Sequence, residues 1–257
     1  MLLTQQLFVA AVLAATRADG AVLEARATNT NLQTVFPAST GTSALAAAKT
    51  IAAGATFDGG MKKFDRSVST CNSQAEGGDA DAVFVLLAGS VLSNVIIGPN
   101  NGEGVHCLGA CTLNNVWWVD VCEDAATFKA SAGTSYINGG GARSASDKVL
   151  QHNGGGTLAV KNFYADTFGK LYRSCGNCDT QYKRTSTFTN VHLSGGGAVA
   201  GINTNYGDKV TITNSCVLDT DLCYKYTGNS VGDEPPMTGS GADGTYCIVS
   251  GVTTSGC

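Results

Sequence analysis

The residues best suited to chemistry lie in the middle of the chain, between positions 103 and 173. Two adjacent carboxylates, Glu123 and Asp124, come first. Three isolated cations follow, at Lys148, Lys170 and Arg173. The steps from 124 to 148 and from 148 to 170 are 24 and 22 residues, close to one coil of a β-solenoid, in which residues one coil apart stack above each other. Such a fold would gather these charges on one flank, where the carboxylates suit a calcium ion and the cations suit an acidic sugar.

A third carboxylate extends the acidic part of this group. Glu103 precedes Glu123 by 20 residues, again about one coil. Because neighbours in a strand face opposite sides and a buried bare carboxylate is costly, Glu123 and Asp124 are expected at a strand end or turn. Three carboxylates on adjacent coils make an oxygen-rich site, which suits calcium better than zinc. A solvated acidic patch is the alternative that the spacing leaves open.

The three cations could serve either catalysis and substrate binding or structural ion pairing. Lysine can act as a base where desolvation or nearby positive charge lowers its pKa, whereas arginine stays protonated and suits the clamping of a carboxylate. Lys170 and Arg173 stand among apolar residues, so structural ion pairing is the alternative to substrate binding. His152, in the turn Q-H-N-G-G-G, is expected to order a loop rather than to transfer protons.

Short strands are the elements that must position these residues. Charged residues make up 14% of the chain, against about 25% in a typical globular domain, and 33 glycines accompany few helix-forming stretches. An apolar–polar–Asn–apolar frame recurs at Asn94, Asn115, Asn162, Asn190 and Asn214, with the segment around Tyr136 between the second and third members. This recurrence predicts a parallel β-helix in which asparagines adopt left-handed turns and bond along the solenoid. A β-sandwich with coincidental spacing is the alternative.

Three regions are expected along the chain. Residues 1–20 hold an apolar run followed by small residues, typical of a secretory signal peptide and too short to span a bilayer. Residues 21–34 are polar and unpatterned, which indicates a flexible lead-in. Residues 35–257 form one all-β domain, and their Ala-rich segment 43–52 is predicted to cap the solenoid with a short N-terminal helix.

Charge and cysteine content narrow the function. The net charge is −4 and no basic run occurs, so nucleic acid is not an expected partner, and no second apolar segment suggests a membrane. Ten cysteines follow the apolar N-terminus, and an even number predicts disulfides in a secreted protein. The one C-x-x-C, at 175–178, lacks the second ligand pair of a zinc site. Sequence leaves the pairing open.

Taken together, several motifs resemble the secreted fungal pectate lyases of polysaccharide lyase family 3. They are V-C-E-D-A-A-T-F-K, G-E-G-V-H-C, Q-H-N-G-G-G-T, G-K-L-Y-R-S-C-G-N-C and G-I-N-T-N-Y-G-D. The resemblance runs from about Val35 to Cys257. It implies a right-handed parallel β-helix, a calcium cofactor, and β-elimination of polygalacturonate, the pectate of plant cell walls, to unsaturated oligogalacturonides by an extracellular monomer.

The resemblance also implies roles for the charged residues. Glu123 and Asp124 match calcium ligands, and Glu103 stands where bacterial relatives carry aspartate. Lys148 matches the candidate base.

Lys170 and Arg173 match groups that bind substrate carboxylates, and Arg173 is the rival base.

A polygalacturonase-like glycoside hydrolase is one alternative to a lyase, but a hydrolase needs a carboxylic acid opposite its base. A non-catalytic polysaccharide-binding solenoid is the other.

Overall fold

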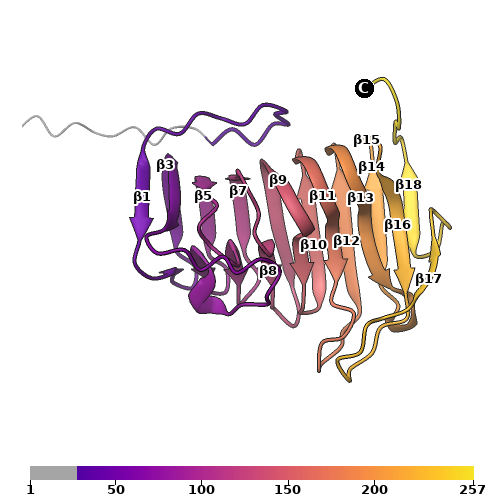
Figure 1. The fold of residues 1–257 in the computed structure, drawn as a ribbon. Coiled ribbons are helices and arrows are strands. Elements are labelled where there is room, and N and C mark those ends of the chain that lie inside the picture. Colours follow the sequence, from indigo (N-terminus) through magenta and orange to yellow (C-terminus); the bar gives the residue numbers. More distant parts are fainter. Residues whose placement is uncertain (1–27) are drawn as a thin grey trace, which may run out of the picture.

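The computed structural model describes residues 28–257, so the segment expected to be a signal peptide lies outside the described residues. The described chain is a right-handed parallel β-solenoid of about eight turns (Figure 1). Its strands are β1 (Thr42–Leu45), β2 (Lys49–Ile51), β3 (Thr56–Arg66), β4 (Phe84–Leu86), β5 (Val91–Ile97), β6 (Val105–Cys107), β7 (Thr112–Trp118), β8 (Asp124–Phe128), β9 (Thr134–His152), β10 (Gly156–Lys161), β11 (Tyr164–Ser174), β12 (Arg184–Thr189), β13 (His192–Asn203), β14 (Lys209–Thr213), β15 (Cys216–Leu218), β16 (Asp221–Tyr226), β17 (Met237–Ser240) and β18 (Cys247–Ser250). Within residues 28–257 the only helical segments are two 3₁₀ turns, η1 (Asp79–Asp81) and η2 (Thr204–Tyr206).

Parallel strands form three faces along the solenoid. One face joins β2, β4, β6, β8 and the C-terminal parts of β9, β11 and β13 to β16. It is called the site sheet below. The other two faces share strands β5, β7 and β9, each of which bends at a corner. Among the strands of residues 28–257, only β17 runs antiparallel to its partner, β16, at the C-terminal end. The prediction of a parallel β-helix is confirmed.

A row of left-handed residues makes the corner between the second and third faces. Its members are Asn94, Asn115, Gly139, Asn162, Asn190 and Asn214, with φ between 50° and 70°. Asparagine tolerates this conformation better than most residues. The Asn115 amide donates to Asn94 Oδ1 at 2.9 Å, and the Asn190 amide donates to Asn162 Oδ1 at 2.7 Å. The expected asparagine row is therefore confirmed for two pairs of coils.

The member between Asn115 and Asn162 is Gly139 rather than the segment at Tyr136. Tyr136 pairs with Thr112 and lies on the face before the corner. A Cβ on Gly139 would come within 2.8 Å of Thr30 Cα, so this position needs glycine for close approach as well as for its φ of 70°. Sequence spacing alone placed the corner three residues too early.

Residues 28–40 lie across this corner. The Asn94 amide donates to the Thr28 hydroxyl and the Asn162 amide donates to the Thr30 carbonyl. Phe36 packs edge-on against Trp117, with ring centroids 5.0 Å apart. Trp117 is therefore buried on the outside of the coil, whereas Trp118 is buried inside it. Neither indole offers a platform for a sugar.

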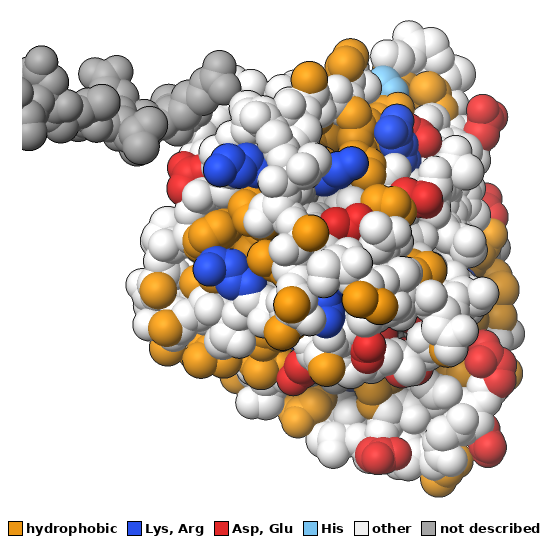
Figure 2. Space-filling view, turned by 60° about the vertical axis from the view of Figure 1, so that its left-hand side comes forward, with side chains coloured by type: hydrophobic (Ala, Val, Ile, Leu, Met, Phe, Trp, Pro, Cys, Tyr) orange, Lys and Arg blue, Asp and Glu red, His pale blue; other side chains and the backbone are white. Residues whose placement is uncertain are grey.

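The prediction that residues 43–52 form a short helical cap is wrong. The Ala-rich segment forms β1 and β2, which pair in parallel with β3 and β4. The hydrogen bonds offered by the next coil outweigh the weak helix propensity of alanine. Within this segment, Lys49 Nζ lies 5.0 Å from the centroid of the Phe57 ring. Figure 2 brings this end forward and shows Lys and Arg side chains standing among hydrophobic ones.

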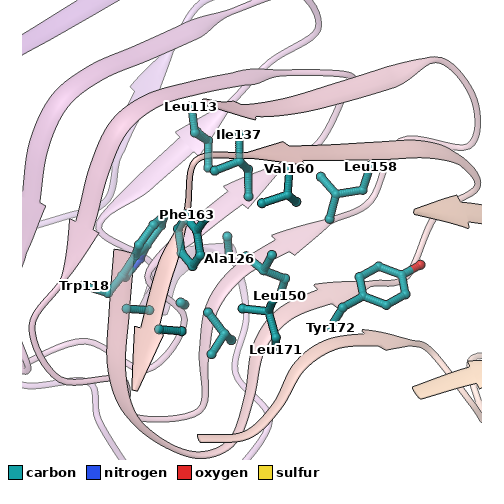
Figure 3. Packing of buried hydrophobic residues seen from close by; sticks show 14 of the residues in the cluster. Leu113, Trp118, Ala126, Ile137, Leu150, Leu158, Val160, Phe163, Leu171 and Tyr172 are labelled. Atoms are coloured by element: carbon teal, nitrogen blue, oxygen red, sulfur yellow. The ribbon is translucent and has the colours of Figure 1, made fainter. Parts of the chain in front are cut away.

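Aliphatic rows fill the interior of the coils. Leu113, Ile137 and Val160 are in register on successive coils, and Figure 3 shows them side by side, with Leu150 and Tyr172 on the opposite row. All five are fully buried. Burial of large side chains of this kind contributes roughly 1.5–3 kcal/mol each, which makes the stacked rows the main source of stability.

All ten cysteines form disulfides, as expected. The pairs are Cys71–Cys122, Cys107–Cys111, Cys175–Cys178, Cys216–Cys257 and Cys223–Cys247. The C-x-x-C motif is one of these bridges. No helix within residues 28–257 is long and apolar enough to cross a membrane.

His152 orders the turn that follows β9. Its ring nitrogens lie 2.9 Å from the Tyr172 hydroxyl and 3.1 Å from the Gly155 carbonyl. Burial, reinforced by the positive charge of Arg184, lowers the pKa of His152 to about 4. The residue therefore serves the fold as a neutral imidazole, in agreement with its expected role.

Changes at the asparagine corner separate backbone strain from hydrogen bonding. Asn115→Gly keeps the left-handed backbone but removes bonds to Asn94 and to the buried Trp117 N–H, so we expect a loss of about 1–3 kcal/mol. Asn115→Ala adds left-handed strain, and we expect about 1 kcal/mol more. Urea unfolding measures both variants. If both variants lost the same unfolding free energy, left-handed backbone strain at position 115 would be contradicted.

Acid should destabilise the protein through His152. An unfolded histidine titrates near 6.5 and the folded one near 4, so the stability contributed by the neutral ring is complete above about pH 6.5 and is lost as the pH falls toward 4. The full loss is about 3 kcal/mol. His152→Gln should reduce the difference in unfolding free energy between pH 7 and pH 4.5. An unchanged difference would contradict this assignment.

Candidate functional site

The site sheet stacks the predicted charges in one column. Asp124 is in register with Lys148, and Lys148 with Lys170. Val105 pairs with Ala126, so Glu103, two residues before Val105, falls beside Asp124. The structure thus brings together the carboxylates and cations that the sequence spacing grouped.

Three carboxylates converge at one end of this column. Glu103, Glu123 and Asp124 each offer an oxygen within 4.8 Å of the other two, and all three side chains are buried. Glu123 precedes β8 and Asp124 is its first residue, the strand-end placement expected for them. Oε2 of Glu123 and both oxygens of Asp124 have no hydrogen-bond partner. Buried anionic oxygens without donors suit a hard divalent cation, so the donor set fits calcium.

Electrostatics at Asp124 support this interpretation. Burial raises the pKa of the Asp124 carboxyl, and the neighbouring charges of Glu123 and Glu103 raise it further, against the attraction of Lys148. Like charges held together out of water disfavour the ionised state. A bound cation would relieve this repulsion.

Lys148 is the cation closest to the carboxylates. Its Nζ lies 2.6 Å from Glu123 Oε1, 3.5 Å from Asp124 Oδ1 and 3.0 Å from Asp147 Oδ2. Burial alone would lower the pKa of Lys148, but the carboxylates of Asp124, Glu123 and Asp147 raise it above its ordinary value. The ammonium form is therefore held as long as these carboxylates keep their charge.

Asp147 links the two lysines and was missed from the sequence. It contacts Lys148 at 3.0 Å and Lys170 Nζ at 3.2 Å. Strand neighbours normally face opposite sides, so nothing in the pattern suggested that Asp147 and Lys148 share a cleft. An irregularity in the register between β9 and β11, near Phe168, redirects the side chain.

Arg173 is held from two sides. Its guanidinium lies over the Tyr226 ring at 3.9 Å and donates from Nη1 to Asn203 Oδ1 at 3.1 Å. The Asn203 amide in turn donates to the Cys175 carbonyl. Burial lowers the pKa of Arg173. Asn203 belongs to the G-I-N-T-N-Y-G-D motif, which therefore helps to position this arginine.

A cleft of about 270 Å³ opens over the cations. Side chains from the site sheet and from three loops line it: Glu76, Asp147, Lys148, Gln151, Lys170, Arg173, Gly176, Asn177, Tyr226, Glu234 and Pro235. Its residues are predominantly polar or charged, so the cleft suits a hydrophilic and charged ligand. The Cys175–Cys178 disulfide closes the loop that carries Gly176 and Asn177.

A loop over the carboxylates orients Glu103. The Gly77 N–H donates to Glu103 Oε1 at 2.6 Å, and His106 Nε2 lies 2.9 Å from Glu103 Oε2. His106 Nδ1 lies 2.7 Å from Asp79 in the same loop. His106 stands in the G-E-G-V-H-C motif, but only the tertiary contacts show that its imidazole supports a candidate metal ligand.

Comparisons with known sequences agree with this geometry. A family model described as pectate lyase matches residues 33–232. Two relatives from Emericella nidulans are similar over most of the chain. "Probable pectate lyase D" is 50% identical over 215 residues, covering 82% of this chain and 81% of its own. "Pectate lyase H" is 51% identical over 197 residues, covering 76% and 75%.

Solved structures give the same answer for the fold. Pectate lyase PelI from Erwinia chrysanthemi, solved in complex with tetragalacturonic acid, matches with a TM-score of 0.67 and 32% identity over 80% of this chain and 69% of its own. Pectate lyase Pel3 from Pectobacterium carotovorum matches with a TM-score of 0.68 and 28% identity over 80% and 67%. A family model over most of the chain and relatives at about half identity, joined to this fold, establish that the chain belongs to the pectate lyase family.

Proposed function

We propose that this protein is a secreted, monomeric, calcium-dependent lyase that cleaves polygalacturonate by β-elimination, with residues 1–20 as its signal peptide. One observation carries the proposal: three buried carboxylates, two of which have unpaired oxygens, lie beside Lys148 at the edge of a cleft lined by Lys170 and Arg173. The membership of the pectate lyase family supports it. The alternatives of a glycoside hydrolase and of a non-catalytic solenoid have no comparable support.

Glu103, Glu123 and Asp124 would hold the calcium ion. Bound there, calcium would draw electron density from the C6 carboxylate of a galacturonate and make its C5 proton more acidic. The carboxylate of Glu103 is held beside those of Glu123 and Asp124 by its contacts with Gly77 and His106. The longer side chain at this position is therefore compatible with a ligand role.

Lys148 would remove the C5 proton. Its Nζ reaches both the carboxylate cluster and the cleft. The base must be neutral to accept a proton. The pKa of Lys148 therefore has to fall when a bound calcium ion offsets the negative charges of Glu123 and Asp124. The C5–H electron pair then forms the C4–C5 double bond. The C4–O bond breaks, and the departing glycosidic oxygen takes a proton from solvent. Because a lysine base is mostly protonated at neutral pH, activity should rise in alkaline solution.

Lys170 and Arg173 would bind the carboxylates of the polymer. Arg173 is fixed by Tyr226 and Asn203, so its planar fork is oriented before substrate arrives. Lys170 is paired with Asp147, and a substrate carboxylate would compete for that ammonium. Arg173 is also the rival for the role of base, because burial lowers its pKa.

The proposed reaction is tested by following the ultraviolet absorbance of the unsaturated product. The mature chain is incubated with polygalacturonate at alkaline pH, with calcium or with EDTA. We expect a rise with calcium, a loss of the rise in EDTA, and recovery when calcium is restored. New reducing ends without absorbance would show hydrolysis and overturn the proposal. Binding without either signal would identify a non-catalytic solenoid.

Substitutions separate the two candidate bases. At saturating calcium, Lys148→Ala should lower kcat by about 10²–10⁴-fold, because a general base of this kind contributes that much, while the polymer still binds. Arg173→Ala should chiefly raise KM. The control is Lys62→Ala, because Lys62 is exposed on β3, outside the cleft, and this variant should match the wild type. A kcat loss confined to Arg173→Ala, with Lys148→Ala active, would reverse the assignment.

A further inference from the structure

The loop over the carboxylates is anchored at its base but weakly held in its middle. This loop, residues 67–83, joins β3 to β4. Arg66 closes the base, because its guanidinium donates to the Ala80 and Ala82 carbonyls at the far end of the loop. Residues 71–76 in between are exposed. A stretch that buries so little surface depends on a few specific contacts to keep its position.

A disulfide fixes the start of this exposed stretch beside the carboxylate cluster. Cys71 is bonded to Cys122, the residue directly before Glu123. The side-chain amide of Gln74 donates to the Cys122 carbonyl, so the loop contacts the same residue twice. The bridge therefore ties the loop to the strand end that presents one candidate calcium ligand.

The end of the exposed stretch reaches a second candidate ligand. The Gly77 N–H donates to Glu103 Oε1 at 2.6 Å, and Asp79 lies 2.7 Å from His106, which contacts Glu103 Oε2. Within residues 28–257, the Gly77 N–H is the one backbone donor between positions 71 and 77 whose acceptor lies outside the loop. A Cβ at Gly77 would lie 2.9 Å from Glu103 Oε1. The loop thus touches the cluster closely, through a short segment that directly follows the bridge.

We propose that the Cys71–Cys122 bridge sets the affinity for calcium by holding Gly77 against Glu103, and that opening the bridge with a dithiol weakens calcium binding without unfolding the solenoid. The inference rests on the proposed function, because it takes the three carboxylates as calcium ligands. Without the bridge the loop gains conformational freedom, and ordering it again opposes binding. The parallel ladder does not run through this loop, so the fold should persist.

The bridge is open to such a reagent. Cys71 is exposed, and both cysteines line an opening of about 300 Å³ together with Ser73 and Gln74. A dithiol reduces the S–S bond by two electrons, leaves one thiol on each cysteine, and is itself oxidised to a disulfide. Three of the other four bridges contain a buried cysteine. The remaining bridge, Cys216–Cys257, serves as the comparison below.

Calorimetric titration with calcium tests the proposal on the mature chain. Cys71→Ser/Cys122→Ser should bind calcium about 10–100-fold more weakly than wild type, as is typical when contacts that orient metal ligands are lost. Its lyase activity should fall at limiting calcium and recover at saturating calcium. A bridge with a merely structural role would change stability toward urea and leave the dissociation constant for calcium unaltered. Equal affinities in the variant and wild type would overturn the proposal.

Cys216→Ser/Cys257→Ser is the matched control. This bridge also spans a long stretch of chain, 41 residues against 51, and also contains an exposed cysteine. It lies at the C-terminal end of the solenoid, away from the carboxylates (Figure 1). Its affinity for calcium should equal that of wild type. A comparable loss in both double variants would show a general effect of a missing bridge and would contradict the proposed role.

A second pair of measurements applies if Cys71→Ser/Cys122→Ser does not fold. Folded wild type is treated briefly with a dithiol, the new thiols are alkylated, and mass spectrometry selects protein modified only at Cys71 and Cys122. Gly77→Ala keeps the bridge but presses a methyl group against Glu103. Both proteins should bind calcium about 10-fold or more weakly. Wild-type affinity in either protein would exclude the route through Gly77.

Failure of the proposed function gives a different result. If wild type binds calcium but yields no unsaturated product, the calorimetric comparison still decides the inference. If wild type does not bind calcium, the calcium dependence and the role of the bridge are both excluded. If wild type binds calcium and forms the product while the bridge variant keeps its affinity, only the inference fails.

Discussion

Backbone hydrogen bonding between successive coils is the constraint on which this structure depends. In a parallel ladder each residue has a fixed partner one coil away, so side chains of one column lie about 4.8 Å apart along the solenoid. The same register that stacks Leu113 on Ile137 in the core stacks Asp124 on Lys148 on the surface of the site sheet. Core and site are therefore products of one geometric rule, and neither can shift without the other.

Stacking in register imposes an electrostatic cost at the carboxylate cluster. Glu103, Glu123 and Asp124 cannot move apart, because the ladder fixes β8 and the contacts of Gly77 and His106 fix Glu103. Lys148 balances only part of the negative charge, and burial prevents water from balancing the rest. A site that is rigid, anionic and short of donors is prepared for a cation before any cation arrives.

Loops complete the cleft that the ladder begins. The loop after β3 is tied by Cys71–Cys122 next to Glu123, and the loop after β11 is closed by Cys175–Cys178. Asn229 N–H donates to the Gly176 carbonyl, which joins the second of these loops to the segment that carries Glu234. The rigid sheet thus supplies the charged column, whereas cross-linked loops supply the walls that decide what fits beside it.

The sequence by itself determined the coil period, the left-handed asparagines, the disulfide-bonded state and the flank that gathers Glu123, Lys148 and Lys170. These features follow from residue type and spacing, which a repeating fold converts directly into position. Tertiary structure decided the rest. Residues 43–52 became strand because the next coil offered backbone partners, and Asp147 entered the cleft because of an irregular register. The supports of Glu103 and Arg173 arise from contacts between segments far apart in the chain. No local pattern encodes such contacts, because they depend on how loops close over the finished ladder.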